Sequence, residues 1–433
     1  MSSITFGGLA TGLDTDAIIE ATMEVERLPV TRLENEKTYL DAELSAYIGL
    51  DVQLEAFQVA AEGLKTVADY TANSSASNLL SASADSSASS GVYNIEVVSL
   101  AKPQKDVSAE GFADADGQTL SGSLTIGEDT VDYRNVSLNE LVDLINDTDG
   151  GVTASVINDG TENGYRLLLT GNEAGVDTTI SGSGSLSIDT IADGHTSTPA
   201  QAHLIVDNVD IYSNSNTITS AIPGVDFDLY ALSEPGETIS LTIDVDTAAI
   251  EAKVNSFVTA YNDVMNYLND QSDADWGNDS WFRSVKRQMQ NLLTTQVETD
   301  GKYSSLSQLG IKTDSKTGTL SIDNETLSEA IKNDLAGVST LLAGDANSSG
   351  IATKFESFLD AQTDADTGIH ATREKSYNQT IKRIDNDVER MELRLAKREE
   401  NLRAQYNALE LLMSELNSQS EYLTQQFAAM ESD

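Results

Sequence analysis

The final 63 residues of the chain carry an apolar side chain at every seventh position. Neither glycine nor proline occurs between Ala371 and Asp433. The repeating positions are Ile381, Val388, Leu395, Leu402, Leu409, Leu416, Leu423 and Met430. Such a repeat keeps one seam of a helix facing a partner helix and is typical of a coiled coil. We predict a single helix here, which at 1.5 Å per residue would span on the order of 90 Å.

The companion positions of this repeat change character along the predicted helix. They are apolar at first and largely polar afterwards: Ile384, Met391, Arg398, Gln405, Leu412, Gln419 and Gln426. In the distal part of the seam, therefore, one series of positions stays apolar while most of its companions are polar. Two interpretations stay open: a helical hairpin that only holds the chain ends together, or a surface that completes its folding on partners in an assembly.

The start of the chain supplies one possible partner helix. Short oxygen-bearing side chains at 14–16 can cap a helix that begins near Ala17. That helix is predicted to stop before Pro29, because the residue ahead of a proline disfavours the α region. A second helix with a single apolar stripe is predicted from there to about Tyr70.

The middle of the chain has a different pattern. Near Asn73 the composition shifts to small polar residues, and apolar residues then recur with a period of 2 instead of 3.6. A short helix capped by Ser137 is expected to reach Ile145. Strands are expected at 91–97, 123–126, 152–156, 166–169, 202–206 and 238–243. Residues 78–247 are thus predicted to form a β-rich block with two lobes.

Helical periodicity returns at Ala248. An apolar face of this helix is predicted to pack against the helix at 30–70, and it consists of Phe257, Tyr261, Val264, Met265 and Leu268. Residues 311–322 predict a hairpin turning at Gly318, followed by a helix from about Asp323. These elements indicate a helix-rich domain completed by a small ribbon.

The predicted fold class is multidomain α+β, with paired N- and C-terminal coiled-coil helices, a helical-bundle domain and inserted β-rich domains. A length of 433 residues agrees with several domains, at about 150 residues per domain. The predicted parts are a terminal coiled-coil leg from 1–40 with 371–433, a helical bundle from 41–77 with 248–370, a β-rich domain from 78–112 with 195–247, and a second β-rich domain at 113–194.

The charge of the chain restricts its partners. Its formal charge of −44 would repel phosphate, so we expect neither nucleic acid nor an anionic membrane as partner. Residues 111–250 hold 23 acidic residues and two basic ones, Arg134 and Arg166, whereas 371–433 hold 12 acidic and nine basic residues. The middle and the end therefore serve different purposes, and the acidity is compatible with a saline habitat.

No pattern for catalysis or for metal binding stands out. Cysteine is absent, which excludes disulfides, thiolate catalysis and cysteine-bound zinc. The three histidines, His195, His203 and His370, are scattered, and no H-E-x-x-H pattern occurs. We predict no catalytic, cofactor-binding or metal-binding residues.

Three weaker patterns are better explained as loops and turns. Gly182-Ser183-Gly184 lacks the rest of a dinucleotide loop and is expected to be a turn. The acidic pairs at 273–275 and 364–366 have Ser284 and Lys375 where an EF-hand requires glutamate. No apolar run is long enough to span a membrane, and the first residues lack a signal-peptide pattern.

Five segments, in order along nearly the whole chain, carry a resemblance to one family. They are GLATGLDT at 8–15 with ERLP at 26–29, GVYNIEV at 91–97, FVTAYN at 257–262, LGI at 309–311 continuing through Gly318 to Asp323, and LMSELNSQS at 412–420 with YLTQQ at 422–426. The sequence resembles flagellar hook-associated protein 2, the filament cap protein FliD. Residues 152–160 with 165–167 look like a repeat module of that family's insert.

The resemblance implies a structural, non-enzymatic protein exported by the flagellar apparatus. It implies a homo-oligomeric ring at the filament tip, with a pentamer favoured, that helps exported flagellin to fold and polymerise. Partners would be other copies, flagellin, the export apparatus and a cytoplasmic export chaperone, and the location would be extracellular. The paired chain ends would form the leg that contacts the filament. Assembly residues are expected along the seven-residue seam and, at the N-terminal side of the leg, at Leu9, Leu13, Asp14, Ile18 and Ile19.

Two other functional classes are alternatives. A surface adhesin would bind glycans through its β-rich lobes and function without any effect on motility. A secreted glycosidase would need a pair of carboxylates, which so acidic a chain could supply. The block is, however, poor in the aromatic residues that usually line sugar sites.

Overall fold

The computed structural model describes residues 10–188, 196–274, 279–297, 302–346 and 348–431. The chain forms two compact units. One comprises residues 1–65, 255–323 and 340–433, and the other comprises 66–254 and 324–339. The chain leaves the first unit after residue 65 and returns to it at residue 255.

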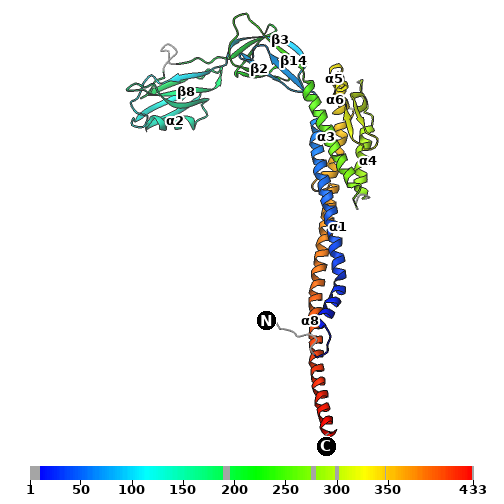
Figure 1. The fold of residues 1–433 in the computed structure, drawn as a ribbon. Coiled ribbons are helices and arrows are strands. Elements are labelled where there is room, and N and C mark those ends of the chain that lie inside the picture. The colour runs from blue at the N-terminus through cyan, green and yellow to red at the C-terminus, as the bar shows by residue number, and fades with distance from the viewer. Residues whose placement is uncertain (1–9, 189–195, 275–278, 298–301, 347, 432–433) are drawn as a thin grey trace. The chain divides into compact units, whose positions relative to one another are not determined.

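The first unit is dominated by two long helices. Helix α1 covers Thr15–Gly63 and helix α8 covers Ile369–Glu431, and the two lie side by side in Figure 1. Asp14 caps α1 by accepting a hydrogen bond from the backbone N–H of Ala17 at 3.0 Å. The single C-terminal helix predicted from the sequence is confirmed.

The predicted helix break at Pro29 is wrong, because Pro29 lies inside a continuous α1. Proline in a helix interior removes a hydrogen bond and costs about 3 kcal/mol. Contacts with α8 offset this cost: Val30 is almost fully buried, and Glu26 and Arg27 pair with residues of α8. Helix α1 also ends at Gly63, short of the predicted Tyr70, where a strand begins instead.

Other elements of the first unit are α4 (Ser280–Thr294), η2 (Leu306–Leu309), β15 (Ile311–Thr313), β16 (Leu320–Ile322) and α7 (Ile351–Thr363), and α7 packs against α1. Helix α3 (Thr247–Gln271) begins in the second unit and continues in the first, α5 (Asn324–Asn333) belongs to the second unit, and α6 (Leu335–Leu342) crosses the boundary between them. Four aromatic rings meet at centroid distances of 5.1 to 6.2 Å, from Phe57, Phe257, Tyr261 and Phe355. This contact between α1 and α3 confirms the predicted packing.

Two local features fix the approach of α3 and the hairpin. Tyr267 donates a hydrogen bond to the carbonyl of Ala46 at 2.9 Å and passes over Gly49, where a Cβ would overlap its ring. The hairpin of β15 and β16 turns at Gly318 as predicted, with a φ of 76°, and the Gly318 carbonyl accepts a hydrogen bond from the buried Tyr261 hydroxyl at 3.2 Å.

A polar and aromatic cluster joins α1, α4 and α8. Tyr47 is fully buried and stacks on Phe282, with ring centroids 5.1 Å apart. The Arg373 guanidinium lies over the Tyr47 ring and donates to the Tyr47 hydroxyl at 3.0 Å. Burial strongly raises the pKa of the Tyr47 hydroxyl. The cluster therefore fixes the first turns of α8 against α1.

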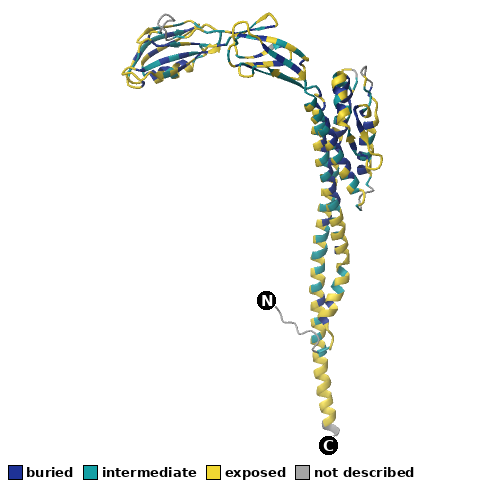
Figure 2. Ribbon diagram, turned by 45° about the horizontal axis from the view of Figure 1, so that its top comes forward, coloured by how far each residue is buried: buried dark blue, intermediate teal, exposed yellow. Residues whose placement is uncertain are grey.

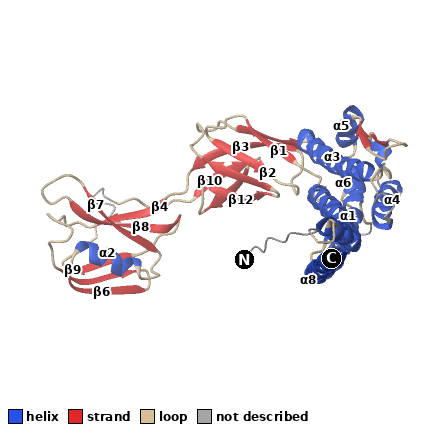
Figure 3. Cartoon of the chain, turned by 60° about the horizontal axis from the view of Figure 1, so that its bottom comes forward, coloured by secondary structure: helices blue, strands red, loops and turns tan. Residues whose placement is uncertain are grey.

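The first β-rich lobe is built from two antiparallel sheets (Figure 3). The larger has the order β1-β14-β3-β10-β11 and the smaller has the order β12-β13-β2. The strands are β1 (Tyr70–Ser74), β2 (Leu80–Ala84), β3 (Gly91–Ser99), β10 (Ala202–Val206), β11 (Val209–Ser213), β12 (Thr217–Ile222), β13 (Val225–Leu229) and β14 (Ile239–Val245). Alternate residues such as Ile95, Val97 and Phe227 form its core.

The second lobe has two three-stranded sheets and a helix (Figure 3). Their orders are β4-β8-β7 and β6-β5-β9. The elements are β4 (Pro103–Val107), β5 (Leu120–Ile126), β6 (Asp129–Val136), α2 (Leu138–Asn146), β7 (Val152–Asn158), β8 (Tyr165–Ala174) and β9 (Ile180–Gly184). As predicted, Ser137 caps α2, in a capping box with Glu140. The turn expected at Gly182–Gly184 is wrong, because these residues form β9 and pair with β5.

Arg166, one of two basic residues in the acidic middle of the chain, has a structural role. Its guanidinium donates to the carbonyl oxygens of Ser108 and Ala109 at 3.0 and 2.8 Å and to the carboxylate of Asp159 at 3.3 Å. It thus satisfies two loop carbonyls next to the edge of β8. Arg134, by contrast, is exposed on β6.

We expect Arg166→Ala to loosen the second lobe, because it leaves two carbonyls without their donor, at a cost of about 1 to 3 kcal/mol. Hydrogen exchange of the β4 and β8 amides measures this effect in the full chain. Arg134→Ala is the matched control and should leave exchange unchanged. Equal exchange in both variants would contradict this role of Arg166.

A buried pair of a histidine and a carboxyl group lies where α8 begins. His370 Nδ1 is 3.1 Å from Asp51 Oδ2, and both side chains are largely buried. Asp51 Oδ1 and His370 Nε2 are buried without a hydrogen-bond partner among the described residues. Burial raises the pKa of Asp51 from its ordinary value of 3.8, the charge of His370 opposes this shift, and Glu55 and Glu374 add to it.

The raised pKa predicts how the stability of the helical unit depends on pH. The fold favours the protonated carboxyl of Asp51. Its contribution to the free energy of unfolding is therefore fully present below the pKa of this group in the unfolded chain, and it is lost as the pH rises through the pKa in the folded chain. Asp51→Asn should therefore gain stability relative to the unchanged chain as the pH rises above about 4, the ordinary pKa of the carboxyl. Urea unfolding followed by circular dichroism measures this difference. A relative loss for the asparagine variant at higher pH would contradict it.

Candidate functional site

The candidate site is the leg, by which we mean α1 from Thr15 to Leu40 together with α8 from Ile381 onward. In its upper part the two helices share one seam. Seven of the eight α8 positions from the repeat have described side chains, and those at Ile381, Val388, Leu395 and Leu402 are half-buried or buried. The companion Ile384 is 3% exposed. This part of the seam is a coiled coil within one chain, as the hairpin interpretation predicts.

Helix α1 carries a matching seam that the sequence analysis missed. Its buried or half-buried positions alternate three and four residues apart: Ile19, Met23, Glu26, Val30, Leu33, Lys37, Leu40 and Leu44. The repeat is visible in the sequence only if the helix continues through Pro29. The assumed break at that residue hid the signal.

Ion pairs cross the seam on both flanks. Lys37 Nζ lies 2.5 Å from Asp385, Arg398 Nε lies 3.1 Å from Glu26, and Arg403 Nη1 lies 2.8 Å from Asp16. Arg27 also pairs with Glu392. The hydrogen bond to Asp385 raises the pKa of Lys37. Exposed pairs of this kind are screened by solvent and contribute little to stability, so their main effect is on the register of the helices.

Among the described residues, no helix covers the lower part of the seam (Figure 2). Leu409, Leu416 and Leu423 are 38%, 47% and 54% exposed. The most distal hydrogen bonds from the described N-terminal residues are those of Ala10 and Thr11 with Glu410 and of Asn417 with Ala10. Exposed apolar residues continue to Phe427. The pattern that predicts a partner helix thus extends beyond the partner that the chain supplies.

The predicted N-terminal leg residues divide into three groups. Ile19 is buried beside α8, and Asp14 is the helix cap. Leu13 and Ile18 are exposed. Leu9 and the side chain of Met430 lie outside the described residues. The structure therefore brings only Ile19 together with the seam of α8.

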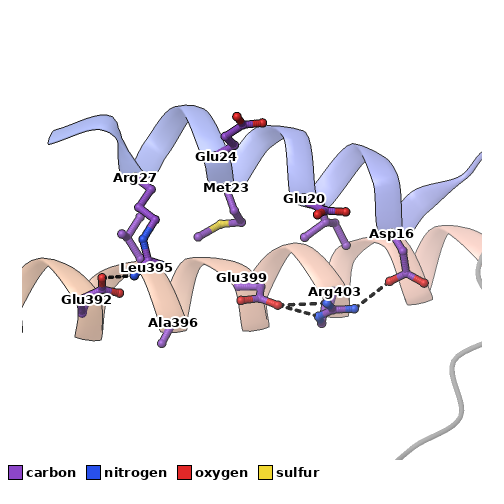
Figure 4. Close-up of a pocket in the computed structure, with 11 residues that line it drawn as sticks. Asp16, Glu20, Met23, Glu24, Arg27, Glu392, Leu395, Ala396, Glu399 and Arg403 are labelled. Carbon is purple, nitrogen blue, oxygen red and sulfur yellow. Dashed lines mark hydrogen bonds and ion pairs between the residues drawn. The ribbon is translucent and has the colours of Figure 1, made fainter. Parts of the chain in front are cut away.

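A groove runs along one flank of the leg and is shown in Figure 4. Its volume is about 570 Å³, and its apolar floor contains Ile19, Met23, Leu395 and Ala396. Its rim is mainly acidic: Asp16, Glu20, Glu24, Glu392 and Glu399, with Arg27 and Arg403. Both arginines are already paired with carboxylates of the rim. We call this feature the acidic groove.

The two histidines that the structure describes lie in separate environments. His203 stacks on Tyr212 in the first lobe and contacts Asp210 at 2.7 Å, His370 belongs to the pair with Asp51, and His195 lies outside the described residues. Within the described ranges, no three potential metal ligands cluster together. The acidic pair at 364–366 forms a turn in which Asp364 caps backbone N–H groups. The described helices include none that is apolar over a length sufficient to cross a membrane.

Comparison with known proteins gives consistent matches over the whole chain. The family model described as the flagellar hook-associated protein 2 N-terminus matches residues 11–104, and the one described as its C-terminus matches residues 200–418. Flagellar hook-associated protein 2 of Escherichia coli strain K12 is 32% identical over 99% of this chain and 98% of that protein. The B-type flagellar hook-associated protein 2 of Pseudomonas aeruginosa is 31% identical over 87% of each.

A solved structure agrees with the fold. The D1-D2-D3 domains of the flagellar cap protein FliD from Escherichia coli align with a TM-score of 0.67 at 29% identity, covering 77% of this chain and 99% of that one. The predicted multidomain α+β architecture, with helical ends and inserted β-rich domains, is thereby confirmed.

The burial gradient of the seam predicts unequal costs of truncation. Ile384→Ala should lower the free energy of unfolding of the leg by about 2 to 5 kcal/mol, because it leaves a cavity between α1 and α8. Leu416→Ala, on the uncovered part, should cost less than about 1 kcal/mol in the isolated chain. Hydrogen exchange of the α1 and α8 amides measures both. Equal costs would mean that the distal seam is covered.

Proposed function

The chain belongs to the flagellar hook-associated protein 2 family, the flagellar cap protein FliD, and we propose that it forms an oligomeric ring at the filament tip that promotes folding and polymerisation of exported flagellin. This family is one of structural cap proteins and not of enzymes. The observation that carries the proposal is the uncovered seam from Leu409 to Leu423, which continues the seven-residue repeat past the first residue of α1.

The exposed seam supports a role in assembly because of its energetics. Several leucine-sized side chains in a row on one helix face leave apolar area exposed to water. Burying this area against a partner would stabilise the complex by about 25 cal/mol per Å². A partner helix that follows the same seven-residue repeat could cover Leu409, Leu416 and Leu423. In the proposed function, that helix comes from a neighbouring subunit or from flagellin.

The remaining parts of the proposal follow from family membership. We propose that the ring is a pentamer, that the chain is secreted through the flagellar export apparatus with a cytoplasmic chaperone, and that it acts outside the cell. We also propose a four-part division: the leg from 1–40 with 371–433, the bundle from 41–77 with 248–370, and the β-rich domains from 78–112 with 195–247 and from 113–194. The matches give no support to a glycan-binding adhesin.

The proposal predicts that the distal seam is needed for filament growth and not for folding. The double variant Leu416→Ser with Leu423→Ser should keep its helical circular dichroism, because both side chains are already exposed, and should abolish filaments and swimming. Electron microscopy of cell filaments and motility in soft agar measure this. Leu411→Ser is the matched control, since Leu411 is 74% exposed on α8 outside the seam of repeats. Normal filaments in the double variant would overturn the proposal.

A further inference from the structure

We propose that the acidic groove of one copy binds a basic face on α8 of the next copy. The legs would then lie side by side, and each leg would use two different surfaces for its two neighbours. The basic face consists of Arg383, Arg390, Leu393, Arg394 and Lys397. This inference rests on the proposed function, which requires copies to associate, and it identifies the surfaces through which the legs meet.

The acidic groove offers both charge and apolar area. Glu20 and Glu24 stand one helical turn apart on its rim, and neither has a cationic partner among the described residues (Figure 4). The half-buried Met23 and Leu395 lie between the helices below them. A ligand for this groove therefore combines an apolar side chain with neighbouring positive charges.

The basic face has that composition. Leu393 is exposed at its centre, and no carboxylate within the described ranges pairs with Arg383, Arg394 or Lys397. In a chain with 70 acidic and 26 basic residues, three cations without a partner around one exposed leucine need an explanation. Two copies of so acidic a chain repel each other, and a local positive face reduces that repulsion where they meet.

The position of the two surfaces suits a ring. Ala396 and Arg394 flank Leu395 on the helix, about 100° to either side of it, so they point to opposite flanks of the leg. The groove uses 392–403 of α8 and the basic face uses 383–397, at overlapping levels along the helix. Rotation about an axis parallel to the leg brings them together without a shift along it, and such a heterologous contact generates a ring when the rotation closes.

The distal tail of a second copy is a poorer occupant of the acidic groove. Residues 404–433 contain five acidic residues and no lysine or arginine. Placing that segment beside Glu20 and Glu24 would oppose like charges. The groove therefore selects the basic face, and the uncovered distal seam stays available for other contacts.

Charge reversal with rescue tests the pairing in the full chain. Glu20→Lys with Glu24→Lys, or Arg394→Glu with Lys397→Glu, should each weaken self-association about tenfold in sedimentation equilibrium, and combining all four should restore it. Glu34→Lys with Glu36→Lys makes the same charge change elsewhere on α1 and should have no comparable effect. Failure of the four-residue variant to recover, or a chain that is monomeric at every concentration, would overturn the inference.

Cross-linking tests the geometry, because the chain has no cysteine of its own. Glu24→Cys with Leu393→Cys should give, on oxidation, a ladder of covalent oligomers. Either single variant should give almost none. Efficient dimers of the Leu393→Cys variant alone would show that the basic face meets itself and would overturn the inference.

The two proposals fail in different ways. If filaments require Leu416 and Leu423 but the charge reversals leave self-association unchanged, the proposed contact between legs is wrong and the proposed cap function stands. If the reversals and their rescue control association while filaments are normal in the Leu416 and Leu423 variant, the pairing stands and the proposed role of the distal seam is wrong.

Discussion

The pairing of α1 with α8 is the interaction on which the rest of this chain depends. It brings the two ends of the sequence together, so that everything between them is an insertion into a helical hairpin. Its seam is buried around Ile384 and fixed in register by ion pairs such as Arg398 with Glu26. The same seam becomes exposed from Leu409 onward. One repeat therefore closes the fold and leaves an exposed apolar surface beyond it.

Local signals in the sequence predicted most elements, and long-range contacts account for the failures. The repeat of α8, the cap at Ser137 and the turn at Gly318 depend on neighbouring residues only, and the structure has all three. The continuity of α1 through Pro29 depends on α8 residues more than 360 positions away. The order of strands in the sheets is likewise set by pairing between distant segments.

The sequence predicted which face of α8 forms the seam, and it did not predict the groove beside that seam. The seven-residue spacing identified the face of α8 that meets a partner and showed where this face is only half apolar. The groove beside Leu395 could not be predicted, because it depends on which side chains of α1 stand opposite. Nor could the role of Arg166, whose guanidinium binds carbonyl groups nearly sixty residues earlier in the chain.

The distribution of charge gives the parts of the chain separate tasks. In the acidic middle, Arg166 is used inside its own lobe, and Arg134 is exposed. Basic residues gather instead on α8 up to Arg403, where some pair with α1 and others remain free on the outer face. Beyond Arg403 the sequence has no basic residue, and exposed apolar side chains continue to Phe427. In our two proposals, lateral contacts between legs therefore depend on charge and contacts of the distal seam depend on apolar burial, so the two should respond differently to salt.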